Sequence, residues 1–118
     1  MKTFPKIEDQ INFVYHGTAG YQGEAYGNPA RGRVGGVKGQ MPTQATKLGG
    51  ALSDAEIVAV ICHERYGSVG GVDAASAAKP EYVKEAEEWC TAGGAKWLEV
   101  EEGGLAKAGV DIGIKKDW

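Results

Sequence analysis

The chain has 118 residues, of which 42% are hydrophobic and 25% are charged, a composition typical of a globular protein with about one domain and an appendage. The formal net charge of −3 argues against a nucleic-acid-binding surface. Glycine accounts for 19 residues, more than twice the usual share of ~7%, which excludes a compact bundle made throughout of good helix formers. The longest apolar run, residues 57–62, is far shorter than the ~20 residues of a membrane-spanning helix.

Residues 5–16 are predicted to form the first helix. Pro5 is tolerated in a first turn, and Glu8 and Asp9 follow where the helix dipole favours acidic side chains. The hydrophobic residues that share one face of this helix are Ile7, Ile11, Val14 and Tyr15. Gly17 is expected to end the helix in a left-handed conformation.

Residues 17–50 are predicted to form a long loop, with eight glycines from Gly17 to Gly39. Structureless loops of this length are usually either functional or disordered, and Tyr21 and Tyr26 near its start suit half-buried positions. We expect the loop to wrap around another group. The glycines have neither of the spacings that cradle phosphates, so nucleotide binding is not expected.

Residues 53–66 are predicted to form the best-defined helix. Ser53 and Glu56 make a capping box, and Leu52 and Ile57 occupy the positions of a hydrophobic staple. Its apolar residues cover more than one narrow stripe, so the helix needs partners on two sides. The glycine that follows it is expected to end the helix.

The remaining residues contain weaker patterns. Residues 68–79 carry small side chains and are interpreted as a linker, and a third helix is predicted over 80–91. Its apolar residues are Tyr82, Val83, Ala86, Trp89 and Cys90, and its acidic residues Glu85, Glu87 and Glu88 are interpreted as a solvated face. Residues 96–100 predict a short strand, and no regular element is expected over 109–118.

Met41 is a candidate metal ligand. The chain contains only one other methionine, Met1, and Pro42 favours an extended backbone that presents the Met41 side chain from the loop. A thioether is a soft, neutral ligand for haem iron. The alternative is that Met41 fills a gap in the interior.

The histidines and cysteines give no further metal site. Neither His16 nor His63 has a second ligand at helical spacing, so a zinc site is not indicated. Two cysteines, Cys62 and Cys90, are too few for a disulfide scaffold, and their spacing leaves open whether they pair.

Several segments resemble the C-terminal half of a class I c-type cytochrome. Residues 39–42 (Gly-Gln-Met-Pro) are similar to the loop that supplies the sixth ligand of haem iron, and residues 52–67 are similar to the closing helix. Residues 4–17 resemble the helix that precedes the ligand loop. Residues 26–28 (Tyr-Gly-Asn) are similar to a spacer in bacterial members of the oxidase-associated type. The resemblance covers about residues 3–71.

The resemblance implies that Met41 is an axial ligand of haem c, with Pro42, Phe13 and Tyr26 around the haem. The family attaches its haem through C-x-x-C-H, and the chain lacks this motif and the N-terminal helix that packs on the closing helix. Residues 59–63 have the A-x-x-C-H form of rare single-thioether cytochromes, but they lie inside a predicted helix. The alternative there is a core cysteine and a packing histidine. The haem is then shared with another chain or lost.

The implied fold is mainly α. It consists of a cytochrome c-like partial domain with long Gly-rich loops in residues 1–71, a linker in 72–79 and a helix-containing C-terminal extension in 80–118. The extension is predicted to be an interaction tail. The aromatic residues expected to anchor a partner are Trp89, Trp97 and Trp118.

Three functions stay open. The first is one-electron transfer in a respiratory chain, with Met41 as a haem ligand and the missing motif either supplied by a partner chain or lost by truncation. The second is a haemless accessory subunit of a membrane respiratory complex, and the third is a small acidic binding domain. No catalysis is expected, because no nucleophile–base pair or paired carboxylates have recognisable spacing.

The resemblance also implies a periplasmic location, since c-type haem is attached outside the cytoplasm. The first residues contain no apolar signal-peptide region. Association with the membrane is therefore expected through respiratory partner subunits, without a transmembrane segment in the chain.

Overall fold

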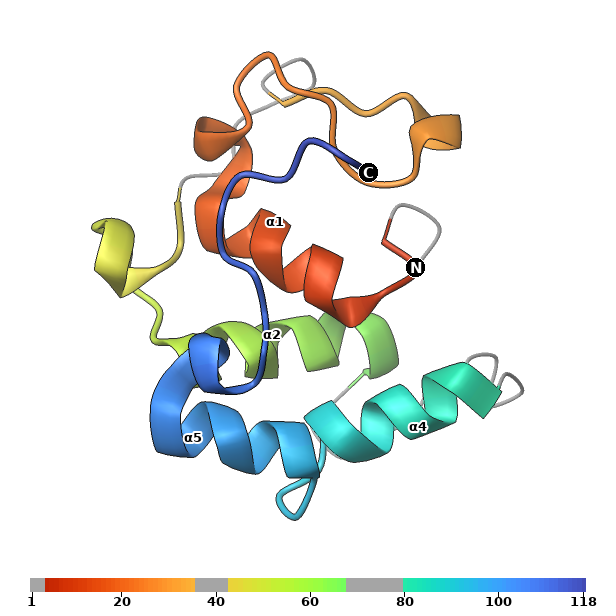
Figure 1. Ribbon diagram of the computed structural model, residues 1–118, viewed down its shortest axis with the longest axis vertical. Coiled ribbons are helices and arrows are strands. Elements are labelled where there is room, and N and C mark those ends of the chain that lie inside the picture. The colour runs from red at the N-terminus through yellow and green to blue at the C-terminus, as the bar shows by residue number, and fades with distance from the viewer. Residues whose placement is uncertain (1–3, 36–42, 68–79) are drawn as a thin grey trace. The chain divides into compact units, whose positions relative to one another are not determined.

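The computed structural model describes residues 4–35, 43–67 and 80–118. Within these ranges the protein is mainly helical, as predicted, and has no strand longer than an isolated bridge (Figure 1). The helices are α1 (Ile7–Gly20), α2 (Asp54–Tyr66), α4 (Pro80–Trp89) and α5 (Ala95–Lys107), with short 3₁₀ helices η1 (Pro29–Arg31) and η2 (Thr46–Leu48). None of these described helices has the length and apolar character needed to cross a bilayer.

The chain divides into two compact units. Unit 1 comprises Met1–Ser53 and Asp111–Trp118, and unit 2 comprises Asp54–Val110. The linker predicted at residues 72–79 lies outside the described residues. The division places the helix that resembles a cytochrome closing helix in the same unit as the two C-terminal helices.

Helix α1 begins two residues later than predicted and its regular backbone breaks at the predicted glycine. Gly17 has φ 70° and ψ 178°, values that interrupt the helix before one further turn to Gly20. A residue with a side chain is strained at a positive φ of this size, which explains why glycine stands there. All four residues predicted to share the apolar face are buried.

The predicted long loop is more ordered than its composition indicates. It contains η1, η2 and isolated bridges that join Gln22 to Gly35, Ala25 to Val34 and Ala45 to Leu52. At Gly35 the backbones approach so closely that a Cβ would lie 2.0 Å from the carbonyl oxygen of Tyr21. Gly35 and Gly50, where a Cβ would lie 2.3 Å from the backbone of Gln44, therefore serve close backbone contacts.

Unit 2 is a set of three helices that contact one another in pairs. Helix α2 has the predicted bounds, because its capping box and terminal glycine are local signals. The carboxylate of Asp54 in its first turn accepts a hydrogen bond of 2.9 Å from the backbone N–H of Leu105. Trp89 at the end of α4 is buried, so it belongs to the core and the prediction that it anchors a partner is wrong.

The prediction of a strand at residues 96–100 is wrong, because these residues lie in α5. The segment contains Leu, Lys and Glu, which are good helix formers. Val100 faces the core and Leu98 is exposed, as helical spacing requires. A short apolar run does not distinguish a strand from a helix by periodicity alone.

Residues 111–118, which we call the strap, follow unit 2 in the sequence and belong to unit 1. They form no helix or strand, as predicted, and run over α1 (Figure 1). Side chains of α1 and of the residues that follow it hold the strap by hydrogen bonds and ion pairs, which are described below.

Candidate functional site

Two of the four predicted haem-contacting residues lie together. The rings of Phe13 and Tyr26 are stacked, with centroids 4.2 Å apart and planes inclined by 26°. Phe4 lies 5.2 Å from Phe13 and 6.0 Å from Tyr26. These three rings form an aromatic cluster in unit 1. The other two predicted residues, Met41 and Pro42, lie outside the described residues.

The rings of Phe13 and Tyr26 leave no space between them for a third ring. A centroid distance of 4.2 Å is that of rings in direct contact. A porphyrin therefore does not fit between Phe13 and Tyr26, although it could lie against their edges. Tyr21 and Trp118 extend the cluster, with ring centroids 5.7 Å apart.

The described donor groups do not fit a haem attached to this chain. The Nε2 of His16 lies 2.5 Å from the carbonyl oxygen of Ile112. Because a carbonyl oxygen only accepts hydrogen bonds, Nε2 is the donor, and this nitrogen has no lone pair left to bind iron. The Sγ atoms of Cys62 and Cys90 are bonded to each other. The chain has no third cysteine for a thioether. The A-x-x-C-H interpretation of residues 59–63 is therefore wrong for the disulfide-bonded chain.

No other metal site is found in the described parts of the chain. They contain no group of three or more His, Cys, Asp or Glu side chains arranged to hold a metal ion. His63 is exposed on α2. The structure therefore leaves Met41 as the one predicted metal ligand still to be tested.

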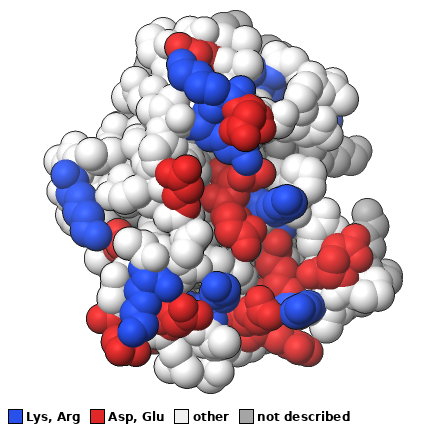
Figure 2. All heavy atoms as spheres, in the orientation of Figure 1, with Lys and Arg blue, Asp and Glu red and all other residues white. Residues whose placement is uncertain are grey.

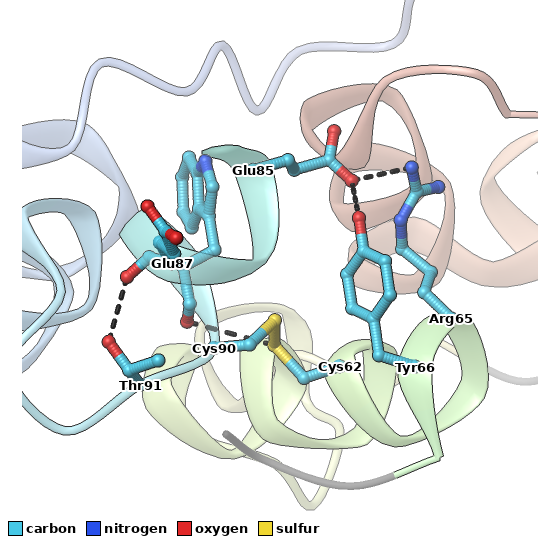
Figure 3. The surroundings of a disulfide bond; sticks show 8 residues. Cys62, Arg65, Tyr66, Glu85, Glu87, Cys90 and Thr91 are labelled. Carbon is cyan, nitrogen blue, oxygen red and sulfur yellow. Dashed lines mark hydrogen bonds and ion pairs between the residues drawn. A yellow bond between two sulfur atoms is a disulfide. The ribbon is translucent and has the colours of Figure 1, made fainter. Parts of the chain in front are cut away.

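The disulfide joins α2 to the residue that follows α4 (Figure 3). The Cα atoms of Cys62 and Cys90 are 5.7 Å apart, and both residues are fully buried. The sequence did not determine this pairing, because cysteine spacing alone does not fix connectivity. A buried cross-link of this kind stabilises a small helical unit that has a limited core.

A buried ion pair lies beside the disulfide in Figure 3. The Nη2 of Arg65 is 2.6 Å from the Oε1 of Glu85, with side chains only 1% and 13% exposed. The hydroxyl of Tyr66 donates a hydrogen bond to the same carboxylate oxygen. Burial and this hydrogen bond raise the pKa of Tyr66 well above its ordinary value.

The prediction that Glu85 belongs to a solvated face is therefore wrong, whereas Glu87 is exposed as predicted. The guanidinium of Arg65 also lies 5.7 Å from the ring centroids of Tyr66 and Tyr82. These contacts satisfy a charge in the interior, which explains why Arg65 is tolerated there. An arginine and a tyrosine at the end of an apolar helix were the signal in the sequence for a buried polar group.

A second polar network ties the strap to α1. The side chain of Asn12, 3% exposed, donates to the carbonyl oxygens of Asp111 at 2.9 Å and Gly113 at 2.6 Å. The hydroxyl of Tyr21 donates to the side-chain oxygen of Asn12 and accepts a bond of 2.9 Å from the backbone N–H of Lys115. Burial is the main cause of the raised pKa of Tyr21.

Two ion pairs accompany this network. Lys115 Nζ lies 2.9 Å from Asp9 Oδ1, and Lys116 Nζ lies 2.9 Å from Glu24 Oε1. The hydrogen bond to Asp9 raises the pKa of Lys115. This network was not predicted from the sequence, although a polar residue such as Asn12 between apolar neighbours was a signal for a buried hydrogen bond.

A cavity of about 310 Å³ lies beside Trp118, the aromatic residue of the strap. Its lining residues are Pro5, Lys6, Asp9, Gly27, Asn28, Pro29 and Trp118. The indole Nε1 of Trp118 is buried and has no hydrogen-bond partner among the residues that the structure describes.

The charged side chains do not form a basic surface in the view of Figure 2. Acidic and basic groups alternate there, and acidic groups predominate over α4 and α5.

Comparisons with family models, with curated proteins and with solved structures gave no match for the chain. The function is therefore proposed from the residues and their geometry.

Proposed function

We propose that the chain is a haemless, cytochrome c-like accessory module of a respiratory oxidoreductase complex, in which it binds a partner protein and does not itself carry electrons. The single observation that carries this proposal is the Cys62–Cys90 disulfide. Covalent attachment of haem c requires a cysteine thiol, and both cysteines of the chain are used in the cross-link.

The disulfide also supports a location outside the cytoplasm. Stable disulfides form in oxidising compartments such as the bacterial periplasm and are rare in the cytosol. A periplasmic module that faces a membrane complex fits this chemistry. The described helices offer no membrane span, so attachment to the complex runs through protein contacts in this proposal.

Electron transfer with Met41 as a haem ligand is the second candidate. The observation that favours it is the Met-Pro pair at residues 41–42, which resembles the ligand loop of class I c-type cytochromes. In this case a partner chain carries the attached haem, and Met41 would hold its iron from the other side. The haem supplies the one-electron chemistry, and the residues of this chain bind and shield it.

Absorption spectroscopy of the purified chain, alone and together with its co-purifying proteins, separates the two candidates. The proposal expects no Soret band in the isolated chain and a mass lower by two hydrogens than that of the reduced form. A Soret band that changes in Met41→Ala, and not in the exposed control Leu48→Ala, would overturn the proposal and favour electron transfer.

A further inference from the structure

The first and last residues of unit 2, Asp54 and Val110, lie close together because both are bonded to Leu105. The backbone N–H of Leu105 donates to the Asp54 carboxylate at 2.9 Å, and its carbonyl oxygen accepts from the N–H of Val110 at 3.1 Å. Leu105 is itself fully buried. The folded unit therefore holds residue 111, where the strap begins, near residue 53.

The strap completes the interior of unit 1. The buried side chain of Asn12 donates to two strap carbonyls, and the hydroxyl of Tyr21 accepts from the N–H of Lys115. Trp118 adds its ring to the aromatic cluster, 5.9 Å from Phe4 and 5.7 Å from Tyr21. Departure of the strap removes these hydrogen bonds from buried groups, which is unfavourable. Unit 1 is therefore complete only when the strap is closed on α1.

The stability of unit 2 depends strongly on its disulfide. A core of fewer than ~70–80 residues is rarely stable without a cross-link or another constraint, and unit 2 is smaller than that. Two of the ten residues of α4, Ala86 and Trp89, are buried, so this helix adds little apolar area to the core. The bond between Cys62 and Cys90 joins α4 to α2. We therefore expect the reduced unit to be close to half unfolded.

Unfolding of unit 2 makes closure of the strap less favourable. In the folded unit, residues 53 and 111 are held close together by the unit itself. In the unfolded unit, they flank a flexible stretch that comprises residues 54–110, and the contacts of the strap alone must bring them together. Loop-closure statistics make this on the order of tenfold less favourable than when the ends are already held together.

We propose that oxidation of Cys62 and Cys90 is the switch that closes the strap on α1, through the folding of unit 2. In the reduced chain, unit 2 opens readily, and departure of the strap uncovers Asn12, Tyr21 and the aromatic cluster. In the oxidised chain, the folded unit keeps the strap in place. This inference goes beyond the proposed function and depends neither on a haem nor on a partner protein.

The chemical step is a thiol–disulfide exchange with an oxidant that itself carries a disulfide. The S–S bond of the oxidant breaks, and the bond between the sulfur atoms of Cys62 and Cys90 forms. Two electrons and two protons pass from the two thiols to the oxidant, which leaves as a dithiol. Both cysteines are fully buried in the folded chain, so the bond is protected from reductants once it has formed and the closed state persists.

Hydrogen exchange at the Lys115 amide, followed by NMR, tests the proposal in the full chain. This N–H donates to the hydroxyl of Tyr21 at 2.9 Å, so it exchanges quickly when the strap leaves. Complete reduction with dithiothreitol is expected to speed its exchange about tenfold. The N–H of Gly35, which donates to the carbonyl oxygen of Glu24 at 3.0 Å, keeps its rate. Unchanged exchange at Lys115 after reduction would overturn the proposal.

The double substitution of Cys62→Ala with Cys90→Ala is the control for the reagent. This variant has no disulfide to reduce, so its Lys115 amide is expected to exchange at the fast rate before dithiothreitol is added and to keep that rate afterwards. Slow exchange at Lys115 in this variant would overturn the proposal, because the strap would then stay closed without the cross-link.

A substitution at the start of unit 2 tests the connection with the disulfide intact. Asp54→Ala removes the acceptor of the Leu105 N–H, and exchange at Lys115 is expected to rise about threefold, the effect of one hydrogen bond. Asp54→Asn keeps an acceptor and restores the slow rate. Glu101→Ala, at an exposed position of α5, is the matched control and leaves the rate unchanged. If reduction also speeds exchange at Gly35, the Asp54 variants decide, and equal rates in the two would overturn the proposal.

Discussion

Cys62 in α2 and Cys90 directly after α4 are joined by a buried disulfide, 28 residues apart in the sequence. The bond connects two helices of unit 2 and encloses residues 68–79, of which the structure describes nothing. The disulfide therefore holds α2 and the end of α4 together.

Removal of the disulfide is expected to destabilise the protein by ~3–4 kcal/mol, the range for a closed loop of this length. The double substitution of Cys62→Ala with Cys90→Ala tests this, because it leaves no unpaired thiol. Urea denaturation followed by circular dichroism measures the free energy of unfolding. Reduction of the unsubstituted chain gives the same loss if the cross-link is the cause, and an unchanged midpoint would contradict the assignment.

Glu85→Ala is expected to lower the free energy of unfolding by about 3 kcal/mol, since it leaves the buried charge of Arg65 without its 2.6 Å ion pair. The matched control is Glu87→Ala on the same helix, where the side chain is exposed. That control changes stability by no more than ~0.5 kcal/mol. Equal effects of the two substitutions would show that Glu85 is solvated after all.

The parts of the fold that the sequence predicted depend on local signals. The bounds of α2 followed from Ser53, Glu56 and Gly67, which act within a few residues of the helix ends. The contacts that escaped prediction join distant residues. Asn12 binds the backbone about a hundred positions away, and no local pattern contains that information.

The candidate site divides in the same way. Phe13 and Tyr26, which the resemblance implies lie around a haem, are in ring contact with each other, and their role toward a haem stays a prediction. The error at residues 96–100 arose because a short segment with three apolar residues can fit a strand or a helix, and only packing within unit 2 decides between them. Glu85 was misjudged because burial by Arg65 depends on another helix.

The raised pKa of Tyr66 predicts a loss of stability at alkaline pH. Its hydroxyl stays protonated in the folded protein, mainly because it is buried, whereas the unfolded chain ionises at the ordinary pKa of 10.0. The stability from this group is present below pH 10 and is lost as the pH rises toward the folded pKa. Unfolding by urea at increasing pH measures the slope.

The control for this prediction is Tyr66→Phe, which keeps the ring and removes the ionisable group. The pKa values of Tyr21 and Lys115 are also raised, so the unsubstituted protein and the Tyr66→Phe variant both lose some stability above pH 10. The difference between the two slopes isolates Tyr66. Parallel slopes would show that its hydroxyl is not held in the protonated form.

Tyr21→Phe is expected to release the central part of the strap. The substitution removes the acceptor of the Lys115 N–H and the donor to Asn12, so the Lys115 amide loses its protection from hydrogen exchange. The loss of two buried hydrogen bonds lowers stability by ~1–3 kcal/mol. Tyr26→Phe, which changes a half-buried tyrosine of the same aromatic cluster, keeps that amide protected, and loss of protection in both variants would contradict the role of Tyr21.

Gly35→Ala tests the close backbone contact that orders the loop. The added Cβ would lie 2.0 Å from the carbonyl oxygen of Tyr21, which is too close for any side-chain rearrangement to relieve. The backbones must therefore separate, at an expected cost of ~2–3 kcal/mol. Gly93→Ala is the matched control, because no atom lies within 4 Å of its added Cβ. Thermal unfolding of both variants decides the point, since a similar midpoint for the two would mean that the bridge between Gln22 and Gly35 does not order the loop in solution.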